Sequence, residues 1–180
     1  MRKTHYENKE FARILGKKGS HIQRIRKELD INIKINTNGD ILIEDEDSLK
    51  ELLASEILEA VAYSFDLDSA LLLKDTNYVF KKIDLKIYAK SSRIKSIKSR
   101  LIGSKGRAKK VIESLANCAM VVTDHFVGLI GKTENIELAS HAIRSLIRGA
   151  PHSNVYKFLE KQQKDLKRYT KEQIEEMIDL

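Results

Sequence analysis

Two short glycine loops of the same form, Gly-x-x-Gly, are the residues in this sequence best suited to binding chemistry. They are Gly16-Lys17-Lys18-Gly19 and Gly103-Ser104-Lys105-Gly106. Glycine at both ends of a tight turn leaves no side chain to block a phosphate backbone, and free N–H groups at the start of the next helix face the phosphates. Lysines inside the loops add charge without selecting a base. Both loops are therefore predicted to hold a nucleic-acid chain.

The residues around the first loop predict the elements that position it. Ile22, Ile25 and Leu29 have helical spacing, and residues 31–35 alternate apolar and polar side chains as a half-buried strand does. Asn38-Gly39 predicts a hairpin turn. The predicted elements are a short strand at 4–7, a helix before the loop, a helix after Gly19, strands at 31–35 and 41–43, and a helix from its N-cap Ser48 to Val61.

The same order of elements repeats 87 positions later. The predicted elements are a strand at 83–88, a basic helix from Arg107, strands at 118–123 and 126–130, and a long helix capped by Thr133. The predicted domains are 1–65 and 83–150, with a helical connector at 66–82 and a C-terminal extension at 151–180.

The C-terminal extension predicts an amphipathic helix. Its apolar positions are Val155, Phe158, Leu159, Ile174, Met177 and Ile178. Such a helix either packs on its own domain or docks on a partner protein, and the sequence leaves both open.

Composition favours a polyanionic partner. Thirty-three Lys and Arg against 26 Asp and Glu give a formal charge of +7. Cys118 has no partner for an internal disulfide, and no apolar run approaches the roughly 20 residues that span a bilayer. We therefore expect a cytoplasmic protein that does not enter a membrane.

No residues predict catalysis, a metal site or a cofactor. Gly131-Lys132-Thr133 resembles the end of a phosphate-binding P-loop, but the glycine required five positions earlier is replaced by Phe126. The five histidines show no ligand spacing. Asp66 and Asp68 are better explained as caps of a short helix.

An apolar pair followed by Gly-x-x-Gly and a helix resembles the signature of the eukaryotic-type (type I) KH domain. The two copies read Ile14-Leu15-Gly-Lys-Lys-Gly and Leu101-Ile102-Gly-Ser-Lys-Gly. The resemblance implies an α+β fold of two tandem type I KH domains, each β-α-α-β-β-α with a three-stranded antiparallel sheet, plus a C-terminal helix. It also implies binding of single-stranded RNA, about four nucleotides at each loop.

The resemblance assigns RNA contacts to the loops and to basic residues on the helices after them. The predicted RNA-binding residues are Gly16, Lys17, Lys18, Gly19, Arg24, Gly103, Ser104, Lys105, Gly106, Arg107, Lys109 and Lys110. In this module the bases lie in a groove between that helix and the central strand. The implied groove residues are Ile22, Arg24, Ile25, Ile33 and Ile35 in the first copy, and Lys109, Lys110, Met120 and Val122 in the second.

The second copy is predicted to make the main contact, because basic residues lie on both sides of its loop. Those residues are Arg93, Lys95, Lys98, Arg100, Arg107, Lys109 and Lys110. The alternatives are that each glycine loop is a plain helix-to-helix turn and that each lysine lies on a solvated helix face. Lys109 stands where the first copy has Ile22, which departs from the usual apolar groove.

Two further segments, residues 66–85 and 146–159, resemble the archaeal KH-domain family involved in small-subunit rRNA processing. The eukaryotic relatives of that family partner the PIN-domain endonuclease that trims the 3′ end of this rRNA. They usually lack an intact first Gly-x-x-Gly, so its presence here favours the archaeal type. The resemblance implies binding of the 3′ region of precursor small-subunit rRNA, with that endonuclease and a translation initiation factor as protein partners.

Two other functions remain open. A general KH protein would bind many single strands about equally, and an interaction scaffold would bind no RNA through its loops.

Overall fold

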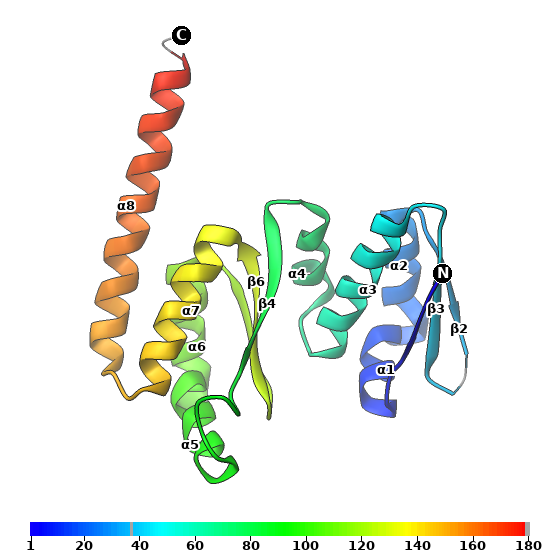
Figure 1. Ribbon diagram of the computed structural model, residues 1–180, viewed down its shortest axis with the longest axis horizontal. Helices are drawn as coiled ribbons and strands as arrows, with labels where there is room; N and C mark the ends of the chain where they lie inside the picture. The colour runs from blue at the N-terminus through cyan, green and yellow to red at the C-terminus, as the bar shows by residue number, and fades with distance from the viewer. Residues whose placement is uncertain (37, 179–180) are drawn as a thin grey trace. The chain divides into compact units, whose positions relative to one another are not determined.

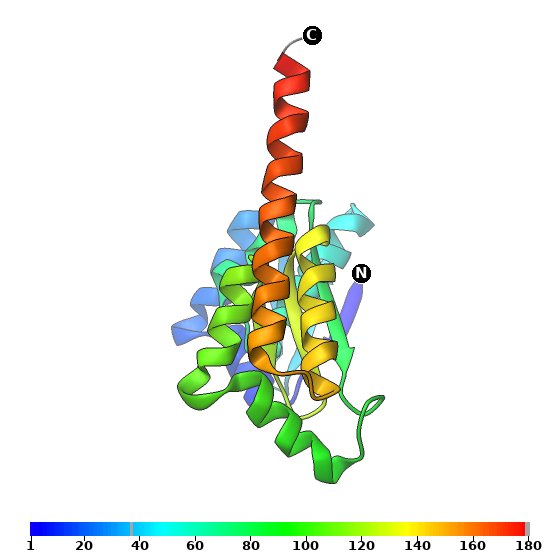
Figure 2. The ribbon, with the colours of Figure 1, turned by 90° about the vertical axis from the view of Figure 1, so that its left-hand side faces the viewer.

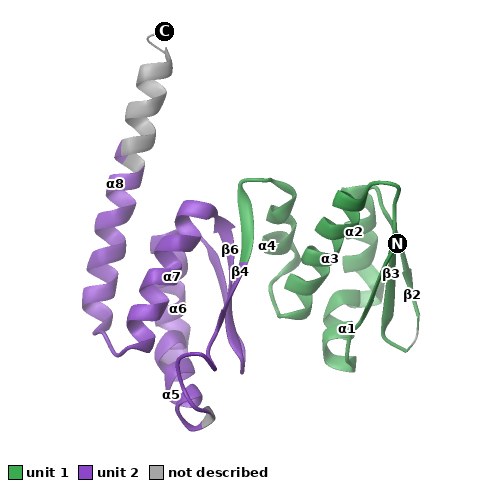
Figure 3. Ribbon diagram, in the orientation of Figure 1, with its two compact units in different colours: residues 1–80 green, residues 81–180 purple. Residues whose placement is uncertain are grey.

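The computed structural model describes residues 1–36 and 38–178, with the backbone alone for residues 91, 167 and 169–178. The chain divides into two compact units, residues 1–80 and 81–180 (Figure 3). Both are α+β and each contains a three-stranded sheet (Figure 1). The domain boundaries expected from sequence, at 65 and 83, stay predictions.

The first unit begins with the predicted order of elements. They are β1 (Arg2–His5), α1 (Asn8–Leu15), the 3-10 turn η1 (Lys17–Gly19), α2 (Ser20–Leu29), β2 (Asn32–Ile35), β3 (Asp40–Glu44) and α3 (Ser48–Ala62). The strand order is β1-β3-β2, and both pairings are antiparallel. The turn from β2 to β3 uses the predicted Gly39, whose φ is +91°.

Apolar residues at the predicted periods form the core of this unit. Ile22 and Ile25 of α2 and Ile33 of β2 are at most 1% exposed, as are Ile41 and Ile43 of β3. The alternation along β3 places its isoleucines on one face of the sheet, against the helices.

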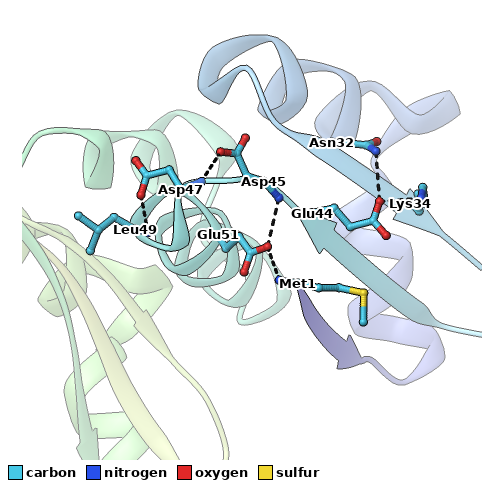
Figure 4. Close-up of polar contacts among 8 residues, drawn as sticks. All are labelled: Met1, Asn32, Lys34, Glu44, Asp45, Asp47, Leu49 and Glu51. Carbon is cyan, nitrogen blue, oxygen red and sulfur yellow. Dashed lines mark hydrogen bonds and ion pairs between the residues drawn. The ribbon is translucent and has the colours of Figure 1, made fainter.

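The N-terminus of α3 is capped one residue earlier than predicted. The Asp47 carboxylate, and not Ser48, accepts a 2.8 Å hydrogen bond from the Leu49 amide (Figure 4). Asp45 in turn accepts a 2.9 Å bond from the Asp47 amide, and Glu51 Oε1 accepts a 3.1 Å bond from the Asp45 amide. Asp47 therefore satisfies one of the free N–H groups that begin α3, and the other two bonds fix the turn before the helix.

The residues predicted as a connector pack in part within the first unit. They form α4 (Leu67–Leu71) and the 3-10 turn η2 (Leu72–Lys74), with α4 packed on α3. Asp66 caps α4 by accepting a 2.8 Å hydrogen bond from the Ser69 amide, as predicted, whereas Asp68 lies in the first turn of the helix and is not its cap.

The second unit has the same order of elements and one added helix, and its first strand begins three residues before the division between the units. They are β4 (Tyr78–Asp84), α5 (Ser91–Ile102), the 3-10 turn η3 (Ser104–Gly106), α6 (Arg107–Ala116), β5 (Ala119–Val122), β6 (Phe126–Lys132), α7 (Thr133–Ile147) and α8 (His152–Ile178). The strand order is β4-β6-β5. Thr133 is the first residue of α7 and not its cap, since the preceding Lys132 holds the N-cap position.

The first strand of this unit lies five residues earlier than the predicted range of 83–88. It runs from Tyr78 to Asp84, and residues 86–88 form a turn. The Asp84 carboxylate accepts a 2.8 Å hydrogen bond from the Lys86 amide. This Asx turn, in which a side chain binds the backbone two residues on, ends the strand. The apolar alternation of residues 83–88 was therefore misleading, and Ile87 is 76% exposed.

Helix α8 runs alongside α6 and α7 of its own unit (Figure 2). Val155 and Leu159 are buried, and the Phe158 ring lies 4.6 Å from the His141 ring of α7. The first turns of α8 thus pack on their own unit. The side chains of Ile174, Met177 and Ile178 lie outside the described residues.

Two contacts recur at equivalent positions of both units. Arg13 donates a 2.9 Å hydrogen bond to the Ala62 carbonyl at the end of α3, and Arg100 donates to the Leu146 carbonyl at 3.0 Å and to the Ala150 carbonyl. In both units, an arginine before the glycine loop therefore binds the carbonyl end of the last sheet-packed helix, where a cation is favoured.

The second recurrent contact joins the helix after the loop to the strand that follows it. In the first unit, Arg26 donates to the Ile33 carbonyl. In the second unit, Glu113 Oε1 accepts a 2.9 Å hydrogen bond from the Met120 amide. The helix side chain is the donor in the first unit and the acceptor in the second. The helix and strand are nevertheless joined at equivalent positions in both units.

We predict that Arg100→Met lowers the free energy of unfolding by about 1.5–3 kcal/mol, because it removes charge-assisted hydrogen bonds to two part-buried carbonyls. Urea denaturation of the whole chain measures this change. The matched control is Arg93→Met on the same helix, whose exposed side chain should matter by no more than about 0.5 kcal/mol. Equal effects of the two substitutions would show that Arg100 does not hold α5 to α7.

Candidate nucleic-acid interface

The two glycine loops have nearly the same backbone conformation. Gly16 has φ +67° and ψ −174°, and Gly103 has φ +71° and ψ 176°, a region that is essentially restricted to glycine. The third residue of each loop, Lys18 or Lys105, is left-handed with φ +51°. Gly19 and Gly106 follow at φ +77° and +75°. The sequence repeat is therefore also a repeat of an unusual backbone turn.

The turn brings the end of one helix against the start of the next. The Gly19 amide donates to the Gly16 carbonyl at 3.4 Å, and the Gly106 amide donates to the Gly103 carbonyl at 3.2 Å. A Cβ on Gly103 would lie 2.7 Å from Ala108 Cβ and 2.8 Å from the Ala108 backbone nitrogen. The first glycine of the loop is thus required by both conformation and close packing.

The middle residues of both loops have side chains that are exposed to solvent. Lys17, Lys18, Ser104 and Lys105 are exposed, and none of them takes part in a salt bridge among the described residues. These side chains are therefore free to meet an anion. All of the predicted loop residues lie in the two turns, and their contact with RNA stays a prediction.

The predicted basic residues on the following helices are not equivalent. Arg24 Nη2 lies 2.6 Å from Asp68 Oδ1 of α4, so this guanidinium already has an anionic partner. Lys109 Nζ lies 3.2 Å from Glu113 Oε1, on the side of α6 that faces β5. Arg107 and Lys110 instead line a hollow between α6 and α8. The structure therefore does not bring Lys109 and Lys110 into one groove.

Four of the apolar residues expected to contact bases belong to the core. Ile22, Ile25, Ile33 and Met120 are at most 1% exposed, so the expectation that they contact bases is wrong. Apolar residues at positions i, i+3 and i+4 of an amphipathic helix pack against the sheet first. Ile35 and Val122 are half-buried and stay predictions.

Part of the basic cluster before the second loop is also committed to the fold. Arg100 binds the carbonyls of Leu146 and Ala150, and Lys98 pairs with Asp124 of the loop between β5 and β6. Arg93 and Lys95 remain exposed. The cluster is therefore smaller than the sequence suggested.

Formal charge distinguishes the two units more than backbone geometry does. Residues 1–80 hold twelve Lys and Arg against fifteen Asp and Glu, a charge of −3. Residues 81–180 hold twenty-one against eleven, a charge of +10. The second unit therefore attracts a polyanion, whereas the first unit as a whole does not.

The residues considered for catalysis have structural positions. Gly131 lies within β6, where an added Cβ would meet Cys118 Cβ at 3.0 Å, so it is not part of a phosphate loop. Burial, followed by the nearby Glu113 carboxylate, raises the pKa of the Cys118 thiol to about 12. Within the described residues, no three His, Cys, Asp or Glu side chains gather as metal ligands, and no helix is long and apolar enough to cross a membrane.

We predict that Gly103→Ala destabilises the chain by at least about 2 kcal/mol more than Gly106→Ala, because strain and overpacking act together only at the first position. Both glycines have positive φ, but a Cβ on Gly106 meets nothing within 4 Å. Urea denaturation of the two variants gives the comparison. Equal losses would mean that the approach to Ala108 does not constrain the loop.

Comparison with known proteins agrees with this geometry. The family model for the second KH domain of PNO1 proteins, a eukaryotic-type KH domain (KH domain type I), matches residues 79–164. A KH domain-containing protein of Methanocaldococcus jannaschii is 35% identical over 160 residues, which are 86% of this chain and 70% of that protein. The pre-rRNA-processing protein pno1 of Emericella nidulans is 27% identical, over 78% of this chain and 56% of that protein.

A solved structure extends the likeness to the fold of nearly the whole chain. It is a chain of the a/eIF2alpha–aDim2p–rRNA complex from Pyrococcus horikoshii, with a TM-score of 0.81 and 30% identity. The match covers 91% of this chain and 94% of that chain. The archaeal relative and this structure are matched over most of their length, whereas the fungal protein is matched over little more than half. The chain belongs to the Pno1/Dim2 family of RNA-binding KH-domain proteins.

Proposed function

We propose that this chain is a ribosome-assembly factor that binds single-stranded RNA in the 3′ region of precursor small-subunit rRNA and assists its endonucleolytic maturation. The observation that carries this proposal is the pair of matching Gly-x-x-Gly turns with free, exposed loop cations. Relatives named for pre-rRNA processing and the rRNA complex of the Pyrococcus horikoshii protein support rRNA as the target.

Both units are proposed to act as KH domains, although only the second is matched by the family model. The support for the first unit is its equal loop conformation and its equal order of strands and helices. Two units on one chain raise each other's local concentration at a shared strand. Modest affinity at each loop then combines into useful affinity.

The second unit is proposed to be the primary contact. Its formal charge is +10, and its loop lysine and Arg107 have no salt-bridge partner among the described residues. In the first unit, by contrast, Arg24 is paired with Asp68. Phosphate contacts depend on cations that are not already neutralised.

The protein partners proposed with this function are a PIN-domain endonuclease and a translation initiation factor. The chain itself would cut nothing, and would present the cleavage site to the endonuclease. The a/eIF2alpha in the Pyrococcus horikoshii complex supports an initiation factor as partner. The proposed setting is the cytoplasm.

Binding to a short oligonucleotide of the small-subunit rRNA 3′ end, compared with a scrambled strand of the same composition, tests the proposed target. We expect tighter binding to the rRNA strand, since base contacts beside the loop add to a backbone grip that both strands share. Fluorescence anisotropy at several salt concentrations separates the two contributions. Equal binding to both strands would leave a general KH protein, and no binding to either would leave an interaction scaffold.

A further inference from the structure

A hollow of about 670 Å³ lies beside the second glycine loop, between α6 and α8. It is lined by Ser104, Lys105, Arg107, Lys110, Val111, Ser114, Leu115 and Glu160. Its volume is in the range of small-ligand pockets. Figure 2 shows the two helices that form its walls running side by side.

The hollow is separate from the groove that faces β5. Its α6 residues lie at positions 107, 110, 111, 114 and 115, which form one stripe of a helix with 3.6 residues per turn. Lys109 and Glu113 lie on the opposite side, where Glu113 binds the Met120 amide of β5. The loop residues Ser104 and Lys105 line the hollow as well, so the hollow adjoins the second glycine loop.

In the first unit, ion pairs neutralise the charges on the equivalent face of α2. The positions 87 residues earlier than Val111 and Leu115 are Arg24 and Glu28. Arg24 pairs with Asp68 at 2.6 Å, and Glu28 pairs with Lys74 at 2.6 Å, both partners coming from the segment α4–η2. The charges on the corresponding surface of α2 are therefore neutralised, although the four paired side chains remain 38–79% exposed.

The second unit leaves its face charged and open. In the part of the chain that the structure describes, no salt bridge involves Lys105, Arg107 or Lys110. Glu160 of α8 is the single carboxylate among the lining residues. Val111 and Leu115 are half-buried and add an apolar floor, while Ser104 and Ser114 add hydroxyl groups.

We propose that this hollow binds one nucleotide of the RNA strand next to those held by Gly103–Gly106. The cations would meet its phosphate, and Val111 and Leu115 would contact its base or ribose. The C-terminal helix thereby forms one wall of an RNA site that the KH unit alone does not have. This inference rests on the proposed function.

The test compares a four-nucleotide strand, which a Gly-x-x-Gly loop can hold by itself, with an eight-nucleotide strand that extends past it. Lys110→Glu should weaken the longer strand about three- to tenfold and leave the shorter strand within about twofold. The slope of log K against log salt for the longer strand should become shallower by about 0.7, as for one lost phosphate contact.

Glu160→Gln provides a gain of binding that misfolding cannot imitate. Removing the one carboxylate of the hollow should tighten binding of the longer strand about two- to threefold.

The matched control for Lys110→Glu is Lys132→Glu, which makes the same change of charge at an exposed lysine at the end of β6. It should affect both strands equally and weakly.

Each contrary outcome has one meaning. Equal weakening of both strands by Lys110→Glu, or no tightening by Glu160→Gln, overturns the inference. If the hollow takes free mononucleotides instead, Lys110→Glu leaves both strands unaffected, which also overturns it. If wild-type protein binds neither strand, the proposed function fails. If wild-type protein binds both strands and Lys105→Glu weakens binding of both, the proposed function stands. The results for Lys110→Glu and Glu160→Gln then test the inference alone.

Discussion

The structure depends on a backbone turn that glycine alone permits without strain. At Gly16 and Gly103 the chain combines a φ near +70° with an extended ψ, and then passes through two left-handed residues. This turn sets α1 against α2 and α5 against α6. It leaves open space beside the second glycine of each loop, Gly19 or Gly106. The arginine before each loop and the helix-to-strand contact after it fix the two helices that the turn joins. The exposure of the loop therefore follows from close packing behind it.

Charge, and not backbone geometry, separates the two units. The loops differ by a few degrees, yet the formal charges are −3 and +10. In the first unit, acidic residues cap α3 and pair with the helix after the loop. In the second unit, α8 forms one wall of a hollow over the same helix face, and no salt bridge among the described residues neutralises its cations Lys105, Arg107 and Lys110. The proposal that the two units bind RNA unequally rests on this difference in charge.

The sequence predicted those features of the fold that depend on short, local residue patterns. Both loops, the β-α-α-β-β-α order and the Gly39 turn followed from glycine spacing and from apolar periods. One kind of error was a contact between distant residues, because nothing local indicated that Arg100 would bind carbonyls 46 and 50 residues away. Another was local: the hydrogen bond from the Lys86 amide to Asp84 ends β4, although the apolar alternation continues past it. Lys109 and Lys110 were predicted for one groove, but neighbouring helix residues are about 100° apart and face different surfaces. The stripe from Arg107 to Leu115 was readable in the sequence, whereas its facing residue Glu160 was not.

Paired charge reversals test most directly the claim that equal turns carry unequal RNA sites. Lys105→Glu with Arg107→Glu should weaken binding of the rRNA 3′ strand about tenfold more than Lys17→Glu with Lys18→Glu, because only the second unit has a net positive field around its loop. Reversing the exposed Lys90 and Lys132 together controls for net charge. Equal losses from the two loop variants would contradict the account, since they would show that the shared backbone turn alone sets RNA affinity.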